Sequence, residues 1–282
     1  MDKKVEAAAV FPTEDQKICE TLLGVALRRN DKEKALPELV VALARQFLGA
    51  PYQPQTIERE GAEILVANLR AFDCVTFVES ILALALAIKS GKANCPNYLA
   101  QLKKIRYRRG RIAGYPSRLH YFTDWLWDNE HKGLVINMTE RLGGIPVNKN
   151  LVELTRHRDD HPPLQDDAVF RKMQRVEAAC SRRTFHFIPK ERWREAEGGV
   201  ADGDIIAITT NREGIDVLHV GFAVLVNKKV RLLHASSKAG AVVLSTITLN
   251  CYLRERRSRS GVIVARLRTP SSLPQGNGVE NG

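Results

Sequence analysis

Hydrophobic residues recur at helical spacing through the first two-thirds of the chain, and the spacing changes to strand-like runs near residue 204. The helical pattern predicts helices over 13–30, 33–48, 74–90, 96–107, 117–131 and 165–182, and residues 63–72 read as a short strand or extended segment. The later runs predict strands over 204–210, 217–226, 230–236, 241–249 and 261–267. Helices followed by an antiparallel meander predict an α+β fold.

The chain has 282 residues, which suits one large domain or two small ones. We expect an N-terminal helical extension over 1–45 and a main domain over 46–268. The main domain would carry an insertion around 92–185. The glycine-rich end, "GNGVENG", predicts a disordered tail over 269–282.

The composition is 44% hydrophobic and 27% charged, which is typical of a globular protein. No run of about 18 apolar residues is present, so no membrane insertion is predicted. The start, "MDKKVEAAAVFPTEDQ", lacks the apolar core of a secretory signal. We therefore expect a cytoplasmic location, with the periplasm or cell envelope as the alternative if the chain is trimmed or exported by another route.

The net charge of +11 is concentrated in two basic clusters, 103–111 and 254–259. Such clusters are most often a solvated surface, and the alternative is attraction of an acidic polymer. Neither forms a known nucleic-acid-binding motif, so no nucleic-acid partner is expected. The pattern does not indicate an oligomeric state, and a monomer is the default.

Five cysteines lie far apart without a CxxC pair, which argues against a disulfide framework. Cys74 opens the predicted helix 74–90, directly after Asp73. One interpretation is a buried core cysteine, since residues 74, 77, 78, 81 and 82 share a face. The other is a nucleophile, because a helix start with Asp73 as N-cap offers free N–H groups that stabilise a thiolate or an oxyanion.

A cysteine nucleophile needs a base, and two of the seven histidines lie on consecutive predicted strands. If Asn227 and Lys228 form a two-residue turn, His234 lies opposite Gly221, and His219 and His234 share one face of the sheet as diagonal neighbours. A three-residue turn would place them on opposite faces. The sequence leaves both turns open.

The remaining histidines are interpreted as structural. His120, His131 and His186 lie among aromatic residues or near a helix end. His157 and His161 form "HRDDH", whose i,i+4 spacing could bind a metal, but no third ligand is evident. No metal site is predicted.

The segment 117–125 concentrates side chains suited to substrate binding: Ser117, Arg118, Tyr121 and Asp124. One interpretation is a capped amphipathic helix, with Ser117 as N-cap and Arg118 exposed. The other is that Arg118 binds a carboxylate of a substrate.

The motifs "FDCVTFVES", "GDIIAIT", "LHVGFAVLV" and "LLHASS" together resemble the NlpC-type branch of papain-like cysteine peptidases, which are bacterial cell-wall amidases. With "GYPSRLHYFTDWL", the chain resembles a subgroup formerly classed as a domain of unknown function, whose members are N-acetylmuramoyl-L-alanine amidases acting on muropeptides. The resemblance covers about residues 40–268. It implies a papain-like core, in which the nucleophile helix packs on an antiparallel β-sheet, with extra helices.

The resemblance also implies roles for individual residues. Cys74 would attack an amide carbonyl, His219 would move the proton, and His234 would orient His219. Tyr52, in the "APY" loop, and Asp73 would line the site, with Tyr52 helping to stabilise the oxyanion. No cofactor would be needed, and the partner would be a muropeptide derived from peptidoglycan, as in cell-wall recycling.

Two other functions remain as alternatives. The same residues could cleave the D-glutamyl–diamino acid bond within the stem peptide. A non-catalytic basic binding module would instead leave Cys74 unreactive and bind with a steep salt dependence.

Overall fold

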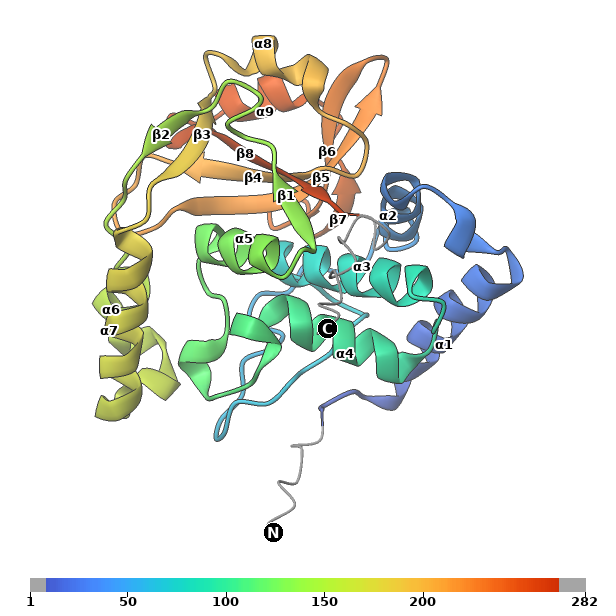
Figure 1. Ribbon diagram of the computed structural model, residues 1–282, viewed down its shortest axis with the longest axis horizontal. Helices are drawn as coiled ribbons and strands as arrows, with labels where there is room; N and C mark the ends of the chain where they lie inside the picture. The colour runs from blue at the N-terminus through green and yellow to red at the C-terminus, as the bar shows by residue number, and fades with distance from the viewer. Residues whose placement is uncertain (1–8, 269–282) are drawn as a thin grey trace, which may run out of the picture.

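The computed structural model describes residues 9–268, in which helices cover both faces of an antiparallel β-sheet (Figure 1). The α-helices are α1 (Thr13–Arg28), α2 (Leu36–Arg45), α3 (Cys74–Lys89), α4 (Cys95–Arg106), α5 (Phe122–His131), α6 (Glu153–Arg156), α7 (Asp167–Ser181), α8 (Trp193–Ala196) and α9 (Leu249–Arg254). Short 3₁₀ turns are η1 (Asp31–Glu33), η2 (Arg108–Gly110), η3 (Tyr115–Ser117), η4 (Arg158–Asp160), η5 (Pro162–Gln165) and η6 (Glu197–Gly199). The strands are β1 (Val135–Asn137), β2 (Ile145–Val147), β3 (Phe185–Pro189), β4 (Ile205–Thr210), β5 (Val217–Val226), β6 (Lys229–Ser236), β7 (Ala241–Leu244) and β8 (Arg259–Leu267).

The sheet has the strand order β2-β3-β8-β4-β5-β6-β7, and β1 also pairs with β8. The α+β class is therefore confirmed, and β4 to β7 form the predicted meander. The last strand does not continue that meander, because β8 returns to pair with β4 on the side away from β5. This placement puts the start of β8 beside the end of β4, where Arg259 pairs with Thr210.

Two predicted elements have the wrong extent. The strand expected over 241–249 ends at Leu244, because Thr248 caps α9 through its side chain, which accepts from the Cys251 N–H. The helix expected over 117–131 begins only at Phe122. The Ser117 hydroxyl donates to the Gly114 carbonyl at 2.6 Å, and this local bond holds a 3₁₀ turn instead of capping a helix.

Three short strands, β1, β2 and β3, were not anticipated, because each gains its hydrogen-bond partners from distant parts of the chain. Residues 63–72 are the opposite case. They make isolated bridges, Val66 with Val10 and Phe72 with Tyr52, and form no strand of the sheet. The second of these bridges positions the segment that enters α3.

The sheet separates two hydrophobic layers. The larger layer buries α3 between the sheet and helices α1, α2, α4 and α5, and the smaller one packs α8 and α9 on the opposite face (Figure 1). A third cluster lies under α6 and α7. Since α1 and α2 belong to the main core, the described part of the expected extension 1–45 has no separate core. Part of the segment 92–185 also builds this core, because α4 packs against α3. The expected tail 269–282 lies outside the described residues.

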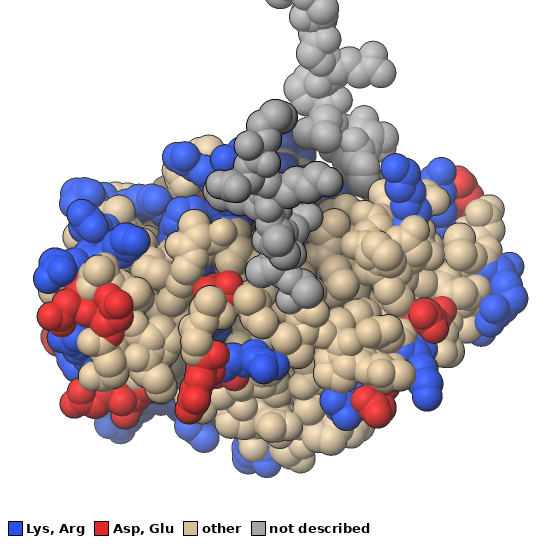
Figure 2. Space-filling view, turned by 90° about the horizontal axis from the view of Figure 1, so that it is seen from below, with Lys and Arg blue, Asp and Glu red and all other residues tan. Residues whose placement is uncertain are grey.

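Charged side chains are distributed over both ends of the face shown in Figure 2. Lys and Arg are interspersed there with Asp and Glu. Among residues 9–268, no helix is both long and apolar enough to cross a membrane.

Candidate active site

The start of α3 is fixed by a reciprocal cap. The Asp73 carboxylate accepts from the backbone N–H groups of Val75 and Thr76 at 2.9 and 2.7 Å, and the Thr76 hydroxyl accepts from the Asp73 N–H at 3.0 Å. The prediction that Asp73 is the N-cap is confirmed. Cys74 is therefore the first residue of the helix, half-buried and close to its positive dipole end.

The hairpin between β5 and β6 has the two-residue turn. Asn227 and Lys228 have φ values of 51° and 60°, as in a type I′ turn, and Val226 pairs with Lys229. This register places His219 and His234 on one face of the sheet, where His219 Nε2 lies 2.5 Å from His234 Nδ1. The rings meet nearly edge to face at 84°.

Gly221 makes room for this histidine pair. A Cβ at position 221 would lie 2.8 Å from the Cβ of His234 and equally close to the Leu233 carbonyl oxygen. Any larger residue at this position would force His234 or the backbone at Leu233 to shift.

Cys74 lies beside the strand that carries His219. The last pair of residues that β5 and β6 form on this side of the hairpin is Phe222 with Leu233, and His219 lies beyond it, nearer the start of β5. The N–H groups of Val220, Cys74 and Val75 favour the thiolate form of Cys74, and α3 packs against β5, so the sulfur lies near the start of β5. Cys74 therefore opens a helix that packs against the strand carrying His219, and His219 contacts His234.

Burial favours the neutral form of each of these three groups. Burial, helped by the Asp73 carboxylate, raises the pKa of the Cys74 thiol to about 12, against the opposing effect of the three N–H groups. Burial, His234 and Arg259 lower the pKa of His219 to about 3, and burial and Arg259 lower the pKa of His234 to about 4. At neutral pH the Cys74 thiol and both imidazoles are therefore neutral.

The loop of Tyr52 is held by backbone contacts to two other segments. The backbone N–H of Tyr52 donates to the Gly240 carbonyl, and the Tyr52–Phe72 bridge ties its loop to the approach to α3. Burial raises the pKa of the Tyr52 hydroxyl, and the charges of Cys74 and Asp73 add to this effect, so the phenol remains a hydrogen-bond donor beside the thiol.

Two residues near the histidines were missed by sequence reasoning. Tyr252 of α9 has its ring centroid 5.8 Å from that of His234 and 6.4 Å from that of His219. Arg259, the first residue of β8, stacks on Tyr252. The only available signal in the sequence was position. Of the arginines in the basic cluster 254–259, Arg259 alone stands at the start of an apolar strand.

The expected substrate-binding residues make contacts within the protein instead of presenting free side chains. Arg118 is 6% exposed and bridges Glu58 and Glu63, so the interpretation of Arg118 as an exposed residue is wrong. The Tyr121 hydroxyl donates to Glu177 at 2.6 Å. Asp124 accepts from two arginines, Arg108 and Arg183. Ser117 is held in its 3₁₀ turn, as described above.

The "HRDDH" segment forms no metal centre in the described part of the chain. His157 is bonded to the Glu153 carbonyl and His161 lies 3.4 Å from the Tyr115 hydroxyl. Within residues 9–268, no group of three or more His, Cys, Asp or Glu side chains is arranged to hold a metal ion. The neutral His120, whose pKa burial lowers to about 3, is bonded to the Tyr115 carbonyl.

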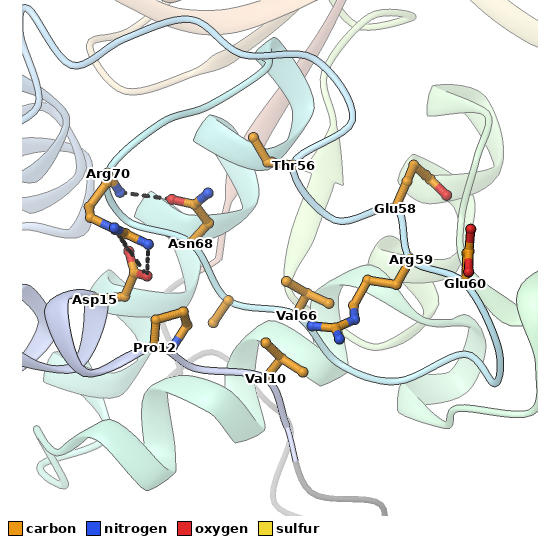
Figure 3. Close-up of a pocket in the computed structure, with 11 residues that line it drawn as sticks. Val10, Pro12, Asp15, Thr56, Glu58, Arg59, Glu60, Val66, Asn68 and Arg70 are labelled. Carbon is orange, nitrogen blue, oxygen red and sulfur yellow. Dashed lines mark hydrogen bonds and ion pairs between the residues drawn. The ribbon is translucent and has the colours of Figure 1, made fainter.

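A hollow of about 510 Å³ lies between the N-terminal segment and residues 56–70 (Figure 3). Asp15 and Arg70 pair at one side of it at 3.2 Å, and Arg59 extends toward Val66 and Val10. Its lining residues come from the segments that precede Cys74 and do not include the thiol or the histidine pair. It is a separate feature of the surface.

Comparison with known proteins assigns the chain to a family. Residues 42–262 match the model of the AmiA-like family, described as N-acetylmuramoyl-L-alanine amidase-like. An N-acetylmuramoyl-L-alanine amidase from Bacteroides uniformis is 33% identical, with a TM-score of 0.76 over 83% of this chain and 99% of that chain.

Two other solved structures are similar. A Bacteroides fragilis protein named as a candidate xylanase is 34% identical, with a TM-score of 0.74 over 80% of this chain and 99% of that one. A Legionella pneumophila protein shares the fold at 20% identity, with a TM-score of 0.70 over 90% and 94% of the two chains. No curated protein sequence matches the chain. The family match spans well over half of the sequence, and the chain therefore belongs to the AmiA-like family of N-acetylmuramoyl-L-alanine amidase-like proteins.

Proposed function

We propose that the protein is a cysteine amidase that hydrolyses the N-acetylmuramoyl-L-alanine bond of muropeptides through Cys74, His219 and His234. Family membership and the amidase from Bacteroides uniformis support a hydrolase that acts on a peptidoglycan-type substrate. The observation that carries the finer proposal is that Cys74 opens a helix packed against β5, the strand that carries one member of a histidine pair joined at 2.5 Å. This is the arrangement of a nucleophile helix on an antiparallel sheet, which we infer to be papain-like.

Each residue has a defined task in this reaction. His219 is hydrogen-bonded to His234 through Nε2, so its Nδ1 is left to act as the base. Nδ1 accepts the Cys74 proton as the sulfur attacks the lactyl carbonyl carbon. The C–N bond then breaks, and His219 donates the proton to the leaving L-alanine nitrogen. Water attacks the thioester, gives its proton to His219, and the thiol is restored as the sulfur leaves.

The remaining groups stabilise charge. For Nδ1 of His219 to be free, Nε2–H must donate to Nδ1 of His234, so His234 fixes the tautomer of His219. The backbone N–H of Cys74 at the helix start, with the Tyr52 hydroxyl, is suited to stabilise the oxyanion. Because the Cys74 thiol and both imidazoles are neutral before the reaction, the proton moves from the sulfur to His219 during the attack and not beforehand.

Other functions have less support. Cleavage of the D-glutamyl–diamino acid bond would use the same side chains, so only the products distinguish it. Glycoside hydrolysis needs two carboxyl groups flanking the bond. Among the described neighbours of Cys74 we find Asp73, whose carboxylate is already used in capping α3. A non-catalytic binding module gives no reason for a histidine pair beside a helix-start thiol. A cytoplasmic location, where soluble muropeptides from wall turnover would be the substrate, remains a prediction.

Mass spectrometry of defined muropeptides, including an anhydro-muramoyl tripeptide, tests the proposal with wild type, Cys74→Ala and His219→Ala. Wild type should release a peptide that begins at L-Ala. Cys74→Ala should release none, and His219→Ala should be slower by about 10²–10⁴-fold because the base is lost. The matched control is Cys251→Ala, since Cys251 is exposed and should be dispensable.

Two results would contradict this proposal in different ways. Cleavage after D-Glu would retain the thiol chemistry but identify an endopeptidase. No cleavage of any muropeptide, together with slow alkylation of Cys74 by iodoacetamide at pH 7, would mean that Cys74 is a core residue.

A further inference from the structure

Arg259 and Tyr252 form a cover over the histidine pair that the mechanism above does not use. The guanidinium carbon of Arg259 lies 3.7 Å from the centroid of the Tyr252 ring, which is the closest contact of this kind described in residues 9–268. The same ring faces His234 and His219 at 5.8 and 6.4 Å. The cation is thus held one ring away from the reacting groups.

The backbone aims Arg259 into this position. The register between β4 and β8 shifts between Thr209 and Thr210, and Arg259 pairs with Thr210 just beyond the shift. Such an irregularity redirects the side chain at the end of a strand. The other arginines of the cluster at 254, 256 and 257 are exposed, whereas the Arg259 side chain is only 11% exposed.

Arg259 is anchored by one end of its guanidinium group. Its Nη1 donates to the Tyr252 carbonyl and to Glu255, at 3.3 Å from the Glu255 carboxylate. The bonds described for this side chain within residues 9–268 all use Nη1. The Nε–H and the Nη2 hydrogens remain available, and they form the flat donor edge with which arginine binds a carboxylate.

The charge of Arg259 reaches both histidines. It contributes to the lowered pKa of His219 and of His234, so its positive potential extends over the site. A substrate anion bound beside Arg259 would be attracted by the same potential. A muropeptide stem offers such an anion, because the D-glutamate that follows L-Ala carries a free carboxylate when linked through its side chain.

We propose that Arg259, supported by Tyr252, is a specificity residue that binds a carboxylate of the stem peptide next to the scissile bond. This inference rests on the proposed amidase function and names the group that the enzyme recognises. Recognition of the carboxylate would restrict cleavage to stems with a free acid at this position. Stems whose carboxylate has been converted to the amide would be poor substrates.

The test compares two anhydro-muramoyl tripeptides in which D-Glu is linked to the diamino acid through its side chain, and which differ only in whether the other carboxyl group of D-Glu is the free acid or the amide. Wild type should prefer the acid by about 10–100-fold in kcat/KM, the range expected for a charge-assisted hydrogen bond. Arg259→Gln should reduce the preference to about one, chiefly by raising KM for the acid. Arg259→Lys should retain part of it, and the matched control Arg257→Gln, from the exposed part of the same cluster, should retain all of it.

Several outcomes would overturn the inference. Equal activity of wild type on the two substrates would do so without any variant. An equal loss of kcat/KM on both substrates in Arg259→Gln would also overturn it, especially if the acid limb of the pH–activity profile shifts. Arg259 would then act only through the histidines. If Arg259→Gln does not fold, an unchanged preference in folded Arg259→Lys would also count against it. Failure of wild type to cleave these substrates or any other muropeptide would instead reject the amidase function on which the inference rests.

Discussion

At the scale of single residues, the histidine pair depends on a position without a side chain. His219 and His234 approach to 2.5 Å, and a Cβ at Gly221 would lie 2.8 Å from the Cβ of His234. The pairing register brings them onto one face, but the register alone does not bring two rings into hydrogen-bond contact. The absence of a Cβ at Gly221 is therefore as important to the site as the histidines.

We predict that Gly221→Ala lowers the free energy of unfolding by about 1–3 kcal/mol, the usual cost of overpacking a core. It should also lower amidase activity, because a shift of His234 or of the backbone at Leu233 would disturb the histidine pair. Chemical denaturation and product formation measure the two effects. The control is Gly198→Ala, since a Cβ at Gly198 meets nothing within 4 Å.

Wild-type activity in folded Gly221→Ala would show that contact between the two histidines is not required. A large loss of stability in Gly198→Ala would show that the measurement reports general sensitivity to alanine and not the contact with His234.

At the scale of elements, α3 begins at Cys74 because Asp73 caps it, and the cap has two opposite effects on the thiol. The N–H groups and the dipole at the helix start favour the thiolate, whereas the charge of Asp73 opposes it. The cap and the charge can be separated, because asparagine keeps the accepting oxygen and removes the charge.

Asp73→Asn should therefore leave stability nearly unchanged and speed alkylation of Cys74 by about two- to tenfold below the thiol pKa. The reason is that removing a negative charge lowers the pKa of the thiol and raises the thiolate fraction. Asp73→Ala should instead destabilise the protein by about 1 kcal/mol through loss of the cap. Iodoacetamide labelling followed by peptide mapping separates Cys74 from the exposed Cys251.

The control for this pair is Asp166→Asn, which changes the N-cap of α7 in the same way. Alkylation of Cys74 should not respond to it. An unchanged labelling rate in Asp73→Asn would show that the Asp73 charge is screened from the sulfur.

At the scale of the whole molecule, contacts between distant segments decide which charged groups remain available. Arg118 was a candidate substrate ligand, but folding places it against Glu58 and Glu63 from a loop more than 50 residues earlier. Arg259 is the opposite case. It belongs to a basic cluster in the sequence, but because β8 pairs with β4, its side chain lies near the histidine pair.

We predict that Arg118→Gln lowers the free energy of unfolding by about 3–5 kcal/mol, because the buried Glu63 loses its partner. KM for the folded enzyme should change little. Thermal or chemical denaturation and steady-state kinetics measure both quantities. Arg111→Gln, at an exposed arginine of the neighbouring basic cluster, is the control. Unchanged stability with a raised KM would restore the interpretation of Arg118 as a substrate ligand.

The sequence by itself determined the features that depend on short-range rules. These are the cap and start of α3 and the strands β4 to β6, since each follows from residues within one turn or one pleat of one another. The structure decided the length of the turn at Asn227 and Lys228, and with it the alignment of the histidines. Only the tertiary structure decided where β8 lies, that Tyr252 belongs to a helix, and whether Arg118 or Arg259 faces the site. These outcomes depend on pairings across long stretches of chain, for which no local pattern of hydrophobic or charged residues carries the information.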